Sequence, residues 1–560
     1  MGSLSLSYRI FADPSAYADV AGIWQVIFGL VQVCVGLIFF SFIISVLCAA
    51  LDELIEKIKD GLLPYKKSGH FLIINYNIKL PLILDEINQR ASQQKQVYDV
   101  VLVFPDNDTI DILRNYLETH CWNSLEVFIR QGDLTSYETY KRLSIEKAFG
   151  IVILASDAHQ TDFDRDNFNL KILASLVNSK CFMNHLMQCQ RKRKPIKCSI
   201  ELSDEVCSRK IALAMVDADG EPLFAVASQR EVLGNVISRC MVDIVHYKIY
   251  VEILSLNGSS IHFVDPNKFS QRGISAGISF EQMLLGFDGG TLIGYSRTND
   301  NGQFQLKICP FAEPLQPADW LLFLTDDPLK ITYSNAPLTV DKKIKVIPPS
   351  EIASRKICVI GDTWPVGNLS NFIDQASIDF LNKSHYIFDD IEEYFETDFI
   401  EMLKHSDYDN IIVNLEDELG FRLTLLLLTS TAINDPFLEK IITIITNPII
   451  EGLLNMNDRY RNSVLSHKIA AKYISQLSFQ KNVEKFFLEL AYPEGFEFNL
   501  LDVGVHISIA DFDTVSELKH ILASYQMIYV GIVDKEKNIH FDSQNIKEAI
   551  QIIVLSQGEY

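Results

Sequence analysis

The most apolar part of the chain lies near its start, since no charged residue occurs between Val20 and Leu51. A bilayer core of about 30 Å needs roughly 20 apolar helical residues, and at about 1.5 Å per residue this run reaches about 48 Å. It lacks the basic segment and the small-residue cleavage site of a secretory signal. The pattern predicts one transmembrane helix with its linker over residues 20–60, ended by Gly61 and Pro64.

After this helix, short apolar runs alternate with amphipathic stretches. The runs, which indicate buried strands, are Phe71–Ile74, Val100–Phe104, Leu125–Ile129, Ile151–Leu154 and Lys197–Ile200. Helical patterns lie between them, for example at Pro81–Arg90 and Asn169–Asn178. Strands that alternate with helices are typical of βαβ units on a parallel sheet. We therefore predict an α/β fold with a doubly wound, Rossmann-like domain over residues 69–220.

The first strand-to-helix turn decides whether such a domain binds a dinucleotide. This turn runs from Ile74 to Leu80 and contains no glycine. A pyrophosphate needs close backbone approach at a glycine-rich turn on a helix N-terminus. The side chains of Asn75, Tyr76 and Lys79 would obstruct that approach. We predict that the domain keeps the Rossmann-like fold and does not bind NAD.

Residues 221–335 have a different character. A helical stretch from Glu231 to Ile253 leads into a strand at Ile261–Val264, and short glycine-rich strands follow from Gly273 to Thr325. The pattern predicts a crossover helix and a small α+β lobe. Together with the Rossmann-like domain they form a first unit over residues 69–335.

The second half of the chain repeats the first. The echoed pairs are Asp409–Asp417 with Phe149–Asp157, Ser463–Leu490 with Glu231–Leu254, and Phe498–Asp502 with His262–Asp265. A new strand and turn also open this half, at Lys356–Gly361. We infer an internal duplication, with a second unit of the same kind over residues 352–560.

Composition narrows the class of protein. The net charge of −22 argues against a nucleic-acid surface and is compatible with a domain that attracts cations. Ten cysteines without a CxxC pair indicate a reducing compartment. Lysines 57, 59, 66 and 67 follow the span and place the large C-terminal part in the cytoplasm. The basic run Gln190–Lys194 fits either anionic lipid, a neighbouring subunit or a solvated loop.

An acidic cluster follows the fourth predicted strand. It consists of Asp162, Asp164 and Asp166, with Asp157 a turn away. Open α/β sheets place ligands at the carboxyl ends of their parallel strands, and carboxylate oxygens suit calcium. One hypothesis is that the cluster binds calcium as a regulatory ion. The alternative is an acidic first turn of the next helix, which the helix dipole favours.

One span followed by two Rossmann-plus-lobe units resembles a channel subunit with tandem RCK (regulator of potassium conductance, TrkA-N-like) domains. The match is closest to the CASTOR/POLLUX family of ion channels, whose filter of the type ADSGSHAD is similar to Ala12–Asp19. The family's ASD with a second Asp looks like Asp157 and Asp164, its V-E-L-S-D looks like Ile200–Asp204, and its L-K-K-V-S-V-x-K-A looks like Lys141–Ala148.

The resemblance implies that Ala12, Asp13, Ser15 and Asp19 belong to the pore and selectivity filter. In a homo-tetramer, Asp13 and Asp19 would each give a ring of four carboxylates, which concentrates cations and replaces part of a hydration shell. Asp19 has a second interpretation as the cap of the transmembrane helix. Asp13 is harder to explain as a cap.

The sequence also departs from the family pattern. Asn75-Tyr76 stands where the family has Gly-Trp, and Pro14 and Tyr17 replace a small residue and a His in the filter. Met1 lies only a few residues before the filter, with no outer helix and no pore helix of normal length. We expect that the native subunit has a further N-terminal part, and the alternative is a member that does not conduct alone.

The leading interpretation is a cation-channel subunit with a cytoplasmic RCK gating ring, regulated by a ligand such as calcium and permeable to potassium or calcium. It would be an integral membrane protein of a prokaryotic plasma membrane or of an organelle or nuclear membrane. The alternative is a membrane-anchored, non-conducting regulatory subunit of a cation transporter. An enzyme is not expected, because no Walker, GxSxG or HExxH motif occurs and the glycine-free turn argues against a dinucleotide-dependent one.

Overall fold

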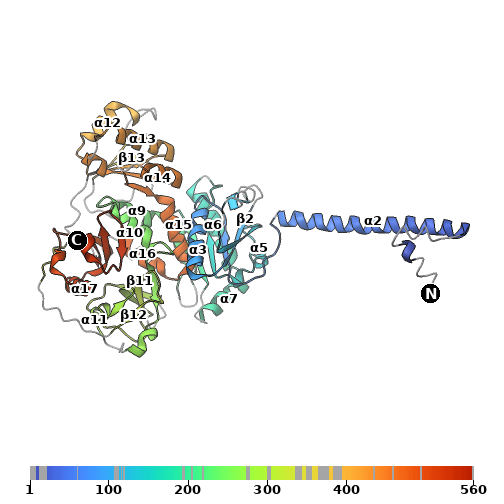
Figure 1. Cartoon of the computed structure of the whole chain (residues 1–560), viewed down its shortest axis with the longest axis horizontal. Helices are drawn as coiled ribbons and strands as arrows, with labels where there is room; N and C mark the ends of the chain where they lie inside the picture. Colours follow the sequence, from blue (N-terminus) through green and yellow to red (C-terminus); the bar gives the residue numbers. More distant parts are fainter. Residues whose placement is uncertain are drawn as a thin grey trace.

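The computed structural model of the chain describes residues 8–11, 22–59, 61–105, 113–114, 116–117, 120, 122–159, 161–191, 196–203, 206–216, 220–272, 278–298, 304–334, 344–348, 356–362, 377–381, 394–432, 435–456, 460–491 and 495–557. A single long helix projects from a body of four larger sheets and their helices (Figure 1).

The projecting helix is α2 (Ile23–Lys59), as the apolar run predicts. Among the described residues it is the one helix long and apolar enough to cross a membrane, and its apolar side chains are largely exposed. Residues 8–11 form a helical turn that packs on its middle, where a Cβ on Gly36 would lie 2.3 Å from the Phe11 carbonyl oxygen. Glycine is therefore required at this close approach.

The first sheet is parallel and has the strand order β3-β2-β1-β4-β5-β6. Its strands are β1 (Phe71–Ile74), β2 (Tyr98–Phe104), β3 (Leu125–Gln131), β4 (Gly150–Ile153), β5 (Lys197–Leu202) and β6 (Ala225–Ser228). The order is that of a doubly wound Rossmann-like sheet, and all five predicted strands are present. The sixth strand, β6, extends the sheet beyond residue 220. It was not predicted, because Ala225–Ser228 is too short a run to stand out in the sequence.

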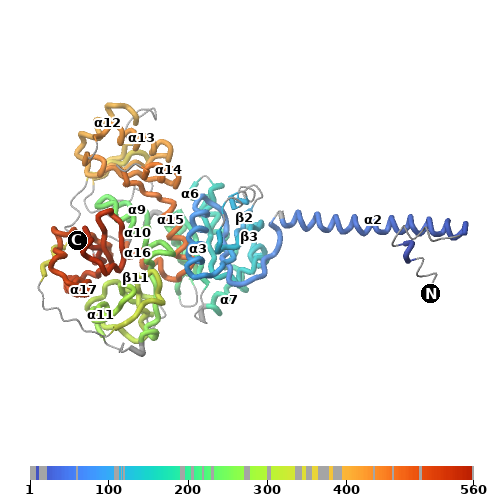
Figure 2. The backbone as a smooth tube through the Cα atoms, viewed as in Figure 1, coloured from blue at the N-terminus to red at the C-terminus, as the bar shows by residue number. Residues whose placement is uncertain are grey.

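Helices cover both faces of this sheet (Figure 2). They are α3 (Leu80–Gln94), α5 (Tyr137–Arg142), η2 (Ile145–Lys147), α6 (Asp162–Val177), α7 (Lys180–Arg191) and α8 (Val206–Leu213). Helix α6 begins at Asp162 rather than at Asn169, since the Thr161 side chain accepts a hydrogen bond from the Asp164 backbone N–H and caps it.

The predicted crossover helix is two helices, α9 (Gln229–Cys240) and α10 (Val245–Ile253). The break follows from Asp243, whose side chain accepts from the Val245 backbone N–H at 2.9 Å and starts the second helix. An antiparallel sheet with the order β10-β9-β11-β7 then forms the first lobe. Its elements are β7 (Ser260–Val264), η3 (Pro266–Arg272), α11 (Phe280–Leu284), β9 (Thr291–Thr298), β10 (Phe304–Ile308) and β11 (Trp320–Thr325), with β8 (Phe287–Asp288) pairing β12 (Thr332–Tyr333) beside it.

The second half repeats the strand order of the first, except that the described residues of its parallel sheet include no counterpart of the edge strand β3. The predicted duplication is confirmed by this order. Its parallel sheet runs β14-β13-β15-β16-β17, and its lobe runs β18-β21-β19-β20, which is the order of the first lobe read from the opposite edge. The strands are β13 (Lys356–Gly361), β14 (Ser377–Leu381), β15 (Asn410–Asn414), β16 (Ile441–Ile445), β17 (Ser463–Leu465), β18 (Phe496–Asp502), β19 (Ile528–Asp534), β20 (Ile539–Phe541) and β21 (Ala549–Gln557).

The helices of this half are α12 (Thr397–Lys404), α13 (Asp417–Thr429), η6 (Pro436–Lys440), α14 (Pro448–Asn455), α15 (Ser466–Phe479), α16 (Val483–Ala491), η7 (Ile509–Asp511), α17 (Val515–Ser524) and η8 (Ile546–Glu548). One of the correspondences predicted between the two halves is shifted in the structure. Residues 463–465 form β17 and correspond to β6, whereas the sequence comparison paired them with Glu231–Leu233 inside α9.

The two halves exchange their helix pairs. The second pair, α15 and α16, belongs to the second half, yet α15 packs on α3 and across β4 and β5 of the first (Figure 1). A Cβ on Gly150 of β4 would lie 2.9 Å from the Ser478 carbonyl oxygen, so the contact is between backbones. At the end of α15 the Phe479 ring packs on Phe71 and Phe149, at 4.9 and 5.8 Å between ring centroids.

The first pair, α9 and α10, makes the reciprocal contact. The Tyr247 hydroxyl of α10 donates to Glu451 of α14 at 3.2 Å and accepts from the Leu465 backbone N–H at 3.2 Å. Asn410, which opens β15, donates to the Met241 carbonyl oxygen at 3.2 Å. Each helix pair therefore lies against the Rossmann-like sheet of the other half, and the two units are joined within one chain.

Two buried ion pairs stabilise the packing of the exchanged helices. Lys472 of α15 pairs with Glu86 of α3, and both side chains are less than 10% exposed. Arg239 of α9 pairs with Glu497 of β18 at 2.5 Å. The Glu86 carboxylate also accepts from the Leu256 backbone N–H at 3.0 Å. Removing one partner of such a pair leaves an uncompensated buried charge, which costs more than the intact pair contributes.

We therefore expect Lys472→Met to lower the free energy of unfolding by about 3–5 kcal/mol, because Glu86 then stays buried without its cation. The measurement is urea unfolding of the detergent-solubilised full chain. The matched control is Lys330→Met, which breaks an exposed pair with Asp326 and should cost less than about 1 kcal/mol. Equal losses of unfolding free energy in the two variants would contradict a stabilising role for the buried Lys472–Glu86 ion pair.

Candidate functional site

The carboxyl edge of β1 and β4 is the place where a doubly wound sheet binds its ligand, because the strand order reverses there. In this chain the turn after β1 contains no glycine, and residues with side chains occupy all of its positions. Asn75 adopts the left-handed conformation at φ +78°, which Asn tolerates better than most residues. The turn is thus formed without the backbone clearance that a glycine provides.

A buried polar network fills the crevice behind this turn. Asn77 is fully buried, and its amide donates to the Ala155 carbonyl oxygen at 2.9 Å and to Glu201 Oε2 at 2.8 Å. The other Glu201 oxygen pairs with the Lys79 ammonium at 2.7 Å. Ala155 N–H donates to Glu201 as well, at 3.0 Å. Strands β1, β4 and β5 are therefore tied together at this edge by one carboxylate.

A carboxylate also occupies the N-terminal end of α3. The Ile78 backbone N–H donates to Asp157 Oδ2 at 2.8 Å, which is the position where a bound phosphate would receive such a bond. The chain thus supplies its own anion at this helix end. The arrangement favours the prediction that this turn does not bind NAD, and that prediction stays untested.

The four aspartates proposed as calcium ligands have separate partners. Asp162 pairs with Arg165 at 3.4 Å, and the Thr161 hydroxyl donates to Asp164 at 2.6 Å. Asp166 is fully buried and accepts from both the backbone N–H and the hydroxyl of Ser203, at 2.8 and 2.7 Å. No group of three or more His, Cys, Asp or Glu side chains within the described ranges is arranged to hold a metal.

Asp166 has a counterpart that sequence reasoning missed. In the second half, Asp417 accepts from the backbone N–H and the hydroxyl of Thr446, at 2.8 and 2.7 Å. Ser203 follows β5 directly, and Thr446 follows β16 directly. Each aspartate thus ties the helix after one strand to the end of the next strand. The signal in the sequence was a Ser or Thr placed immediately after equivalent strands of the duplication.

The residues of the expected filter, Ala12, Asp13, Ser15 and Asp19, lie outside the part of the chain that the structure describes. The same holds for residues 192–194 of the basic run. Their assignment to the pore and to a surface contact stays a prediction.

The exchanged helix brings a histidine to the carboxyl edge of the first sheet. His467 lies at the start of α15, and its buried Nδ1 has no hydrogen-bond partner among the described residues. Burial and the neighbouring Lys79 ammonium lower the pKa of His467 to about 4, although Asp417 and Glu201 act in the opposite direction. No pattern in the sequence could place His467 here, because its neighbours are far away along the chain.

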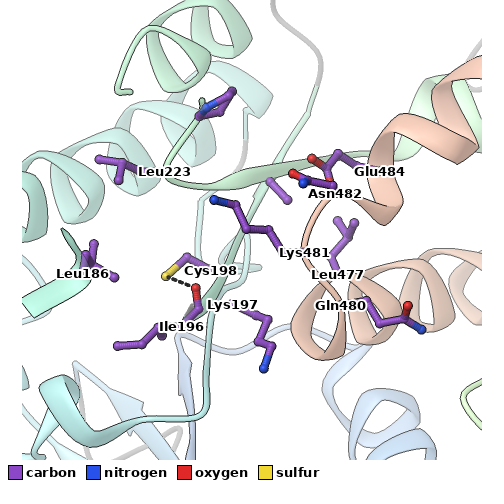
Figure 3. Close-up of a pocket in the computed structure, with 12 residues that line it drawn as sticks. Leu186, Ile196, Lys197, Cys198, Leu223, Leu477, Gln480, Lys481, Asn482 and Glu484 are labelled. Atoms are coloured by element: carbon purple, nitrogen blue, oxygen red, sulfur yellow. Dashed lines mark hydrogen bonds between the residues drawn. The ribbon is translucent and has the colours of Figure 1, made fainter. Parts of the chain in front are cut away.

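A small pocket lies at the opposite, amino edge of the sheet (Figure 3). Its volume is about 40 Å³, and its lining joins the first unit, at Ile196–Cys198 and Leu223, to the second helix pair, at Lys481 and Glu484. Burial raises the pKa of the Glu484 carboxyl, and within the described part of the chain its Oε2 has no hydrogen-bond partner. The pocket has room for water or a small ion and not for a nucleotide.

The position of His467 makes stability depend on pH. Its pKa in the folded chain, about 4, is below the ordinary 6.5, so the unfolded chain binds the proton more readily. Stability is therefore lost as the pH falls from about 6.5 towards 4. We expect His467→Gln to reduce the slope of unfolding free energy against pH in this window by up to about 1.4 kcal/mol per pH unit. His405→Gln, at the exposed residue that follows α12, is the control and should change the slope less than His467→Gln does. A similar effect of both substitutions would contradict this assignment.

Comparison with known proteins supports the family resemblance. No family model matches the sequence. The chain is 20% identical over 346 residues to the probable ion channel SYM8 of Pisum sativum, which is 60% of this chain and 35% of that protein. It is 20% identical over 309 residues to the ion channel POLLUX of Lotus japonicus, covering 54% of this chain and 30% of that protein. The chain thus spans about a third of the length of the curated relatives it matches.

A solved structure supports the fold. The human SLO3 gating ring aligns with 88% of this chain and 100% of its own, with a TM-score of 0.54 and 11% sequence identity. The GsuK channel bound to NAD aligns with the whole of this chain at a TM-score of 0.43 and 14% identity, a likeness too weak to bear on ligands. The chain therefore consists of an apolar N-terminal helix and two tandem Rossmann-like units with the fold of a gating ring, and its sequence is similar to those of the CASTOR and POLLUX ion channels.

Proposed function

We propose that this chain is a subunit of a cation channel whose paired RCK units control the opening of a pore. The observation that carries the proposal is the architecture. Two units whose strand order matches apart from the edge strand β3, held together by exchanged helices, follow directly on a helix of membrane length. The relatives named as ion channels are similar over about 60% of the chain. Both point to a membrane protein with a regulatory body.

In this proposal α2 crosses the membrane and the RCK units lie in the cytoplasm, as the lysines after the span indicate. Four chains form the pore and a gating ring. A ligand that binds one conformation of the ring more tightly shifts the population of open pores by that difference in affinity. Because each chain already joins its two units, the repeating element of the ring is a whole chain.

The ion path is assigned to Ala12, Asp13, Ser15 and Asp19. Rings of carboxylates concentrate cations and replace part of their hydration shell. Potassium and calcium are the candidate permeant ions. Since the segment has two aspartates and lacks the carbonyl-lined filter sequence of strict potassium channels, it favours a pore that admits divalent cations.

This proposal predicts discrete cation currents from the purified, tetrameric protein in planar bilayers. Asp13→Asn should reduce the permeation of divalent cations, or their block of the current, about tenfold relative to wild type. The reason is that one of the two carboxylate rings is removed. Trp24→Phe, at an exposed position of α2, is the control and should leave the permeability ratios unchanged. A silent bilayer with correctly oriented tetramers would instead favour a membrane-anchored regulatory subunit without a pore.

Calcium is the proposed regulatory ion. Asp162 and Asp164 lie in the exposed first turn of α6, where their present partners are a neighbouring Arg165 and the cap Thr161. Calcium binding there would require them to exchange these local contacts for the ion. Asp166 is less suited to that exchange, because it is buried and fastened to Ser203.

The calcium proposal predicts that calcium raises the melting temperature of the full chain in detergent and that the double substitution Asp162→Asn and Asp164→Asn removes most of that rise. The matched control is the double substitution Asp326→Asn and Asp327→Asn in the first lobe, which deletes the same charge. If all three proteins gain the same stabilisation, the cluster on α6 is not the calcium site.

A further inference from the structure

The described segment between α2 and the first sheet contacts the first unit at several points from Gly61 to Gly69. Helix α2 ends in two capping hydrogen bonds, from Gly61 N–H to the Ile58 carbonyl oxygen at 3.2 Å and from Leu62 N–H to the Lys57 carbonyl oxygen at 3.0 Å. This pair of bonds, with Gly61 at φ +65°, is a Schellman motif. The helix therefore stops at a fixed point rather than fraying into a loose tether.

Gly61 is at the same time part of the first unit. Its carbonyl oxygen accepts from the backbone N–H of Gln131, the last residue of β3, at 3.0 Å. A Cβ on Gly61 would lie 3.0 Å from that nitrogen, so the approach requires glycine. The next residue is held too, since Arg142 donates to the Leu62 carbonyl oxygen at 3.1 Å. The end of α2 and the edge of the sheet are thus in direct contact.

Tyr65 forms the centre of this attachment. It is only 3% exposed, and its ring packs on His70 and Phe128 at 4.6 and 5.2 Å between centroids. Its backbone N–H donates to the Arg142 carbonyl oxygen at 3.1 Å, and its own carbonyl oxygen accepts from the Ser144 hydroxyl at 2.7 Å. Ring and backbone are therefore both fixed.

The Tyr65 hydroxyl adds a charge-assisted bond. It donates to Asp99 Oδ2 of β2 at 2.5 Å, and Lys67 pairs with the same oxygen at 2.8 Å. Although burial opposes it, the Lys67 ammonium and the Tyr65 hydroxyl hold the pKa of Asp99 below its usual value. The carboxylate thus stays ionised at neutral pH, and hydrogen bonds to ionised acceptors are stronger than neutral ones.

We propose that α2 is mounted rigidly on the first Rossmann-like unit through Gly61 and Tyr65, so that helix and unit move as one body. A free linker of about ten residues could extend by roughly 33–36 Å before it transmitted a pull. With the anchor in place, no such slack exists, and a displacement of the first unit reaches α2 directly. The idea that this displacement opens a pore rests on the proposed function, whereas the rigid mounting does not.

Hydrogen exchange with mass spectrometry on the full chain in lipid nanodiscs tests the mounting. In wild type we expect the backbone N–H groups of Tyr65, Gly69 and Gln131 to be protected. Tyr65→Phe keeps the ring and removes the bond to Asp99, and it should accelerate exchange of this segment about tenfold. The matched control is Tyr408→Phe, which deletes a Tyr–Asp hydrogen bond of 3.0 Å to Asp379 in the second unit and should leave residues 61–69 unchanged.

Two results would overturn the mounting: exchange of residues 61–69 at the rate of an unstructured peptide in wild type, or no acceleration in Tyr65→Phe. Asp99→Asn serves as a second variant and should accelerate the same segment. In bilayers, Tyr65→Phe should shift the open probability and leave the single-channel conductance unchanged. A wild-type chain that shows protection but carries no current would refute the channel and keep the mounting, so the two failures are distinguishable.

Discussion

The packing of α15 across β4 and β5 is the contact on which the arrangement of the chain depends. It brings a helix from the second half to within a backbone contact of Gly150, places Phe479 among the aromatic rings of the first sheet, and buries Lys472 against Glu86. Apolar burial supplies most of the favourable free energy of such a contact. The ion pair adds selectivity for this register, because any shift would leave two charges buried without partners.

The same contact links the candidate sites to one another. Since α15 starts at the carboxyl edge of the first sheet and ends at its amino edge, it carries His467 to the filled crevice and Leu477 to the small pocket. The crevice itself is closed by Asn77, Lys79 and Glu201. Helix α15 therefore contacts the first sheet at both of its edges.

The first unit has a fixed attachment on its other side as well. Gly61 and Tyr65 tie the end of α2 to β3 and β2, and β2 lies between β3 and β1 in the same sheet. From the second helix pair to the long helix, the structure thus offers a continuous series of packed and hydrogen-bonded elements.

Local pattern was sufficient to predict much of this fold. Buried parallel strands such as Phe71–Ile74 are continuous apolar runs, and α2 is apolar over its whole membrane-length segment, so both stand out in the sequence. The Gly61 helix end and the glycine-free β1 turn could also be predicted, because they depend on backbone conformations that few residues adopt. Short or interrupted elements were missed: β6 is only a brief run, and Asp243 divides a stretch that has one helical period.

The sequence by itself determined the elements, the repeat and the membrane-length helix, because each of these follows from the order of neighbouring residues. Only the tertiary structure decided that the helix pairs are exchanged within the chain, that Asp166 fastens two elements instead of standing in an acidic cluster, and that Tyr65 anchors the linker. These depend on contacts between residues such as Glu86 and Lys472, which lie hundreds of positions apart. Their energies come from burial and geometry in three dimensions, which no local pattern encodes.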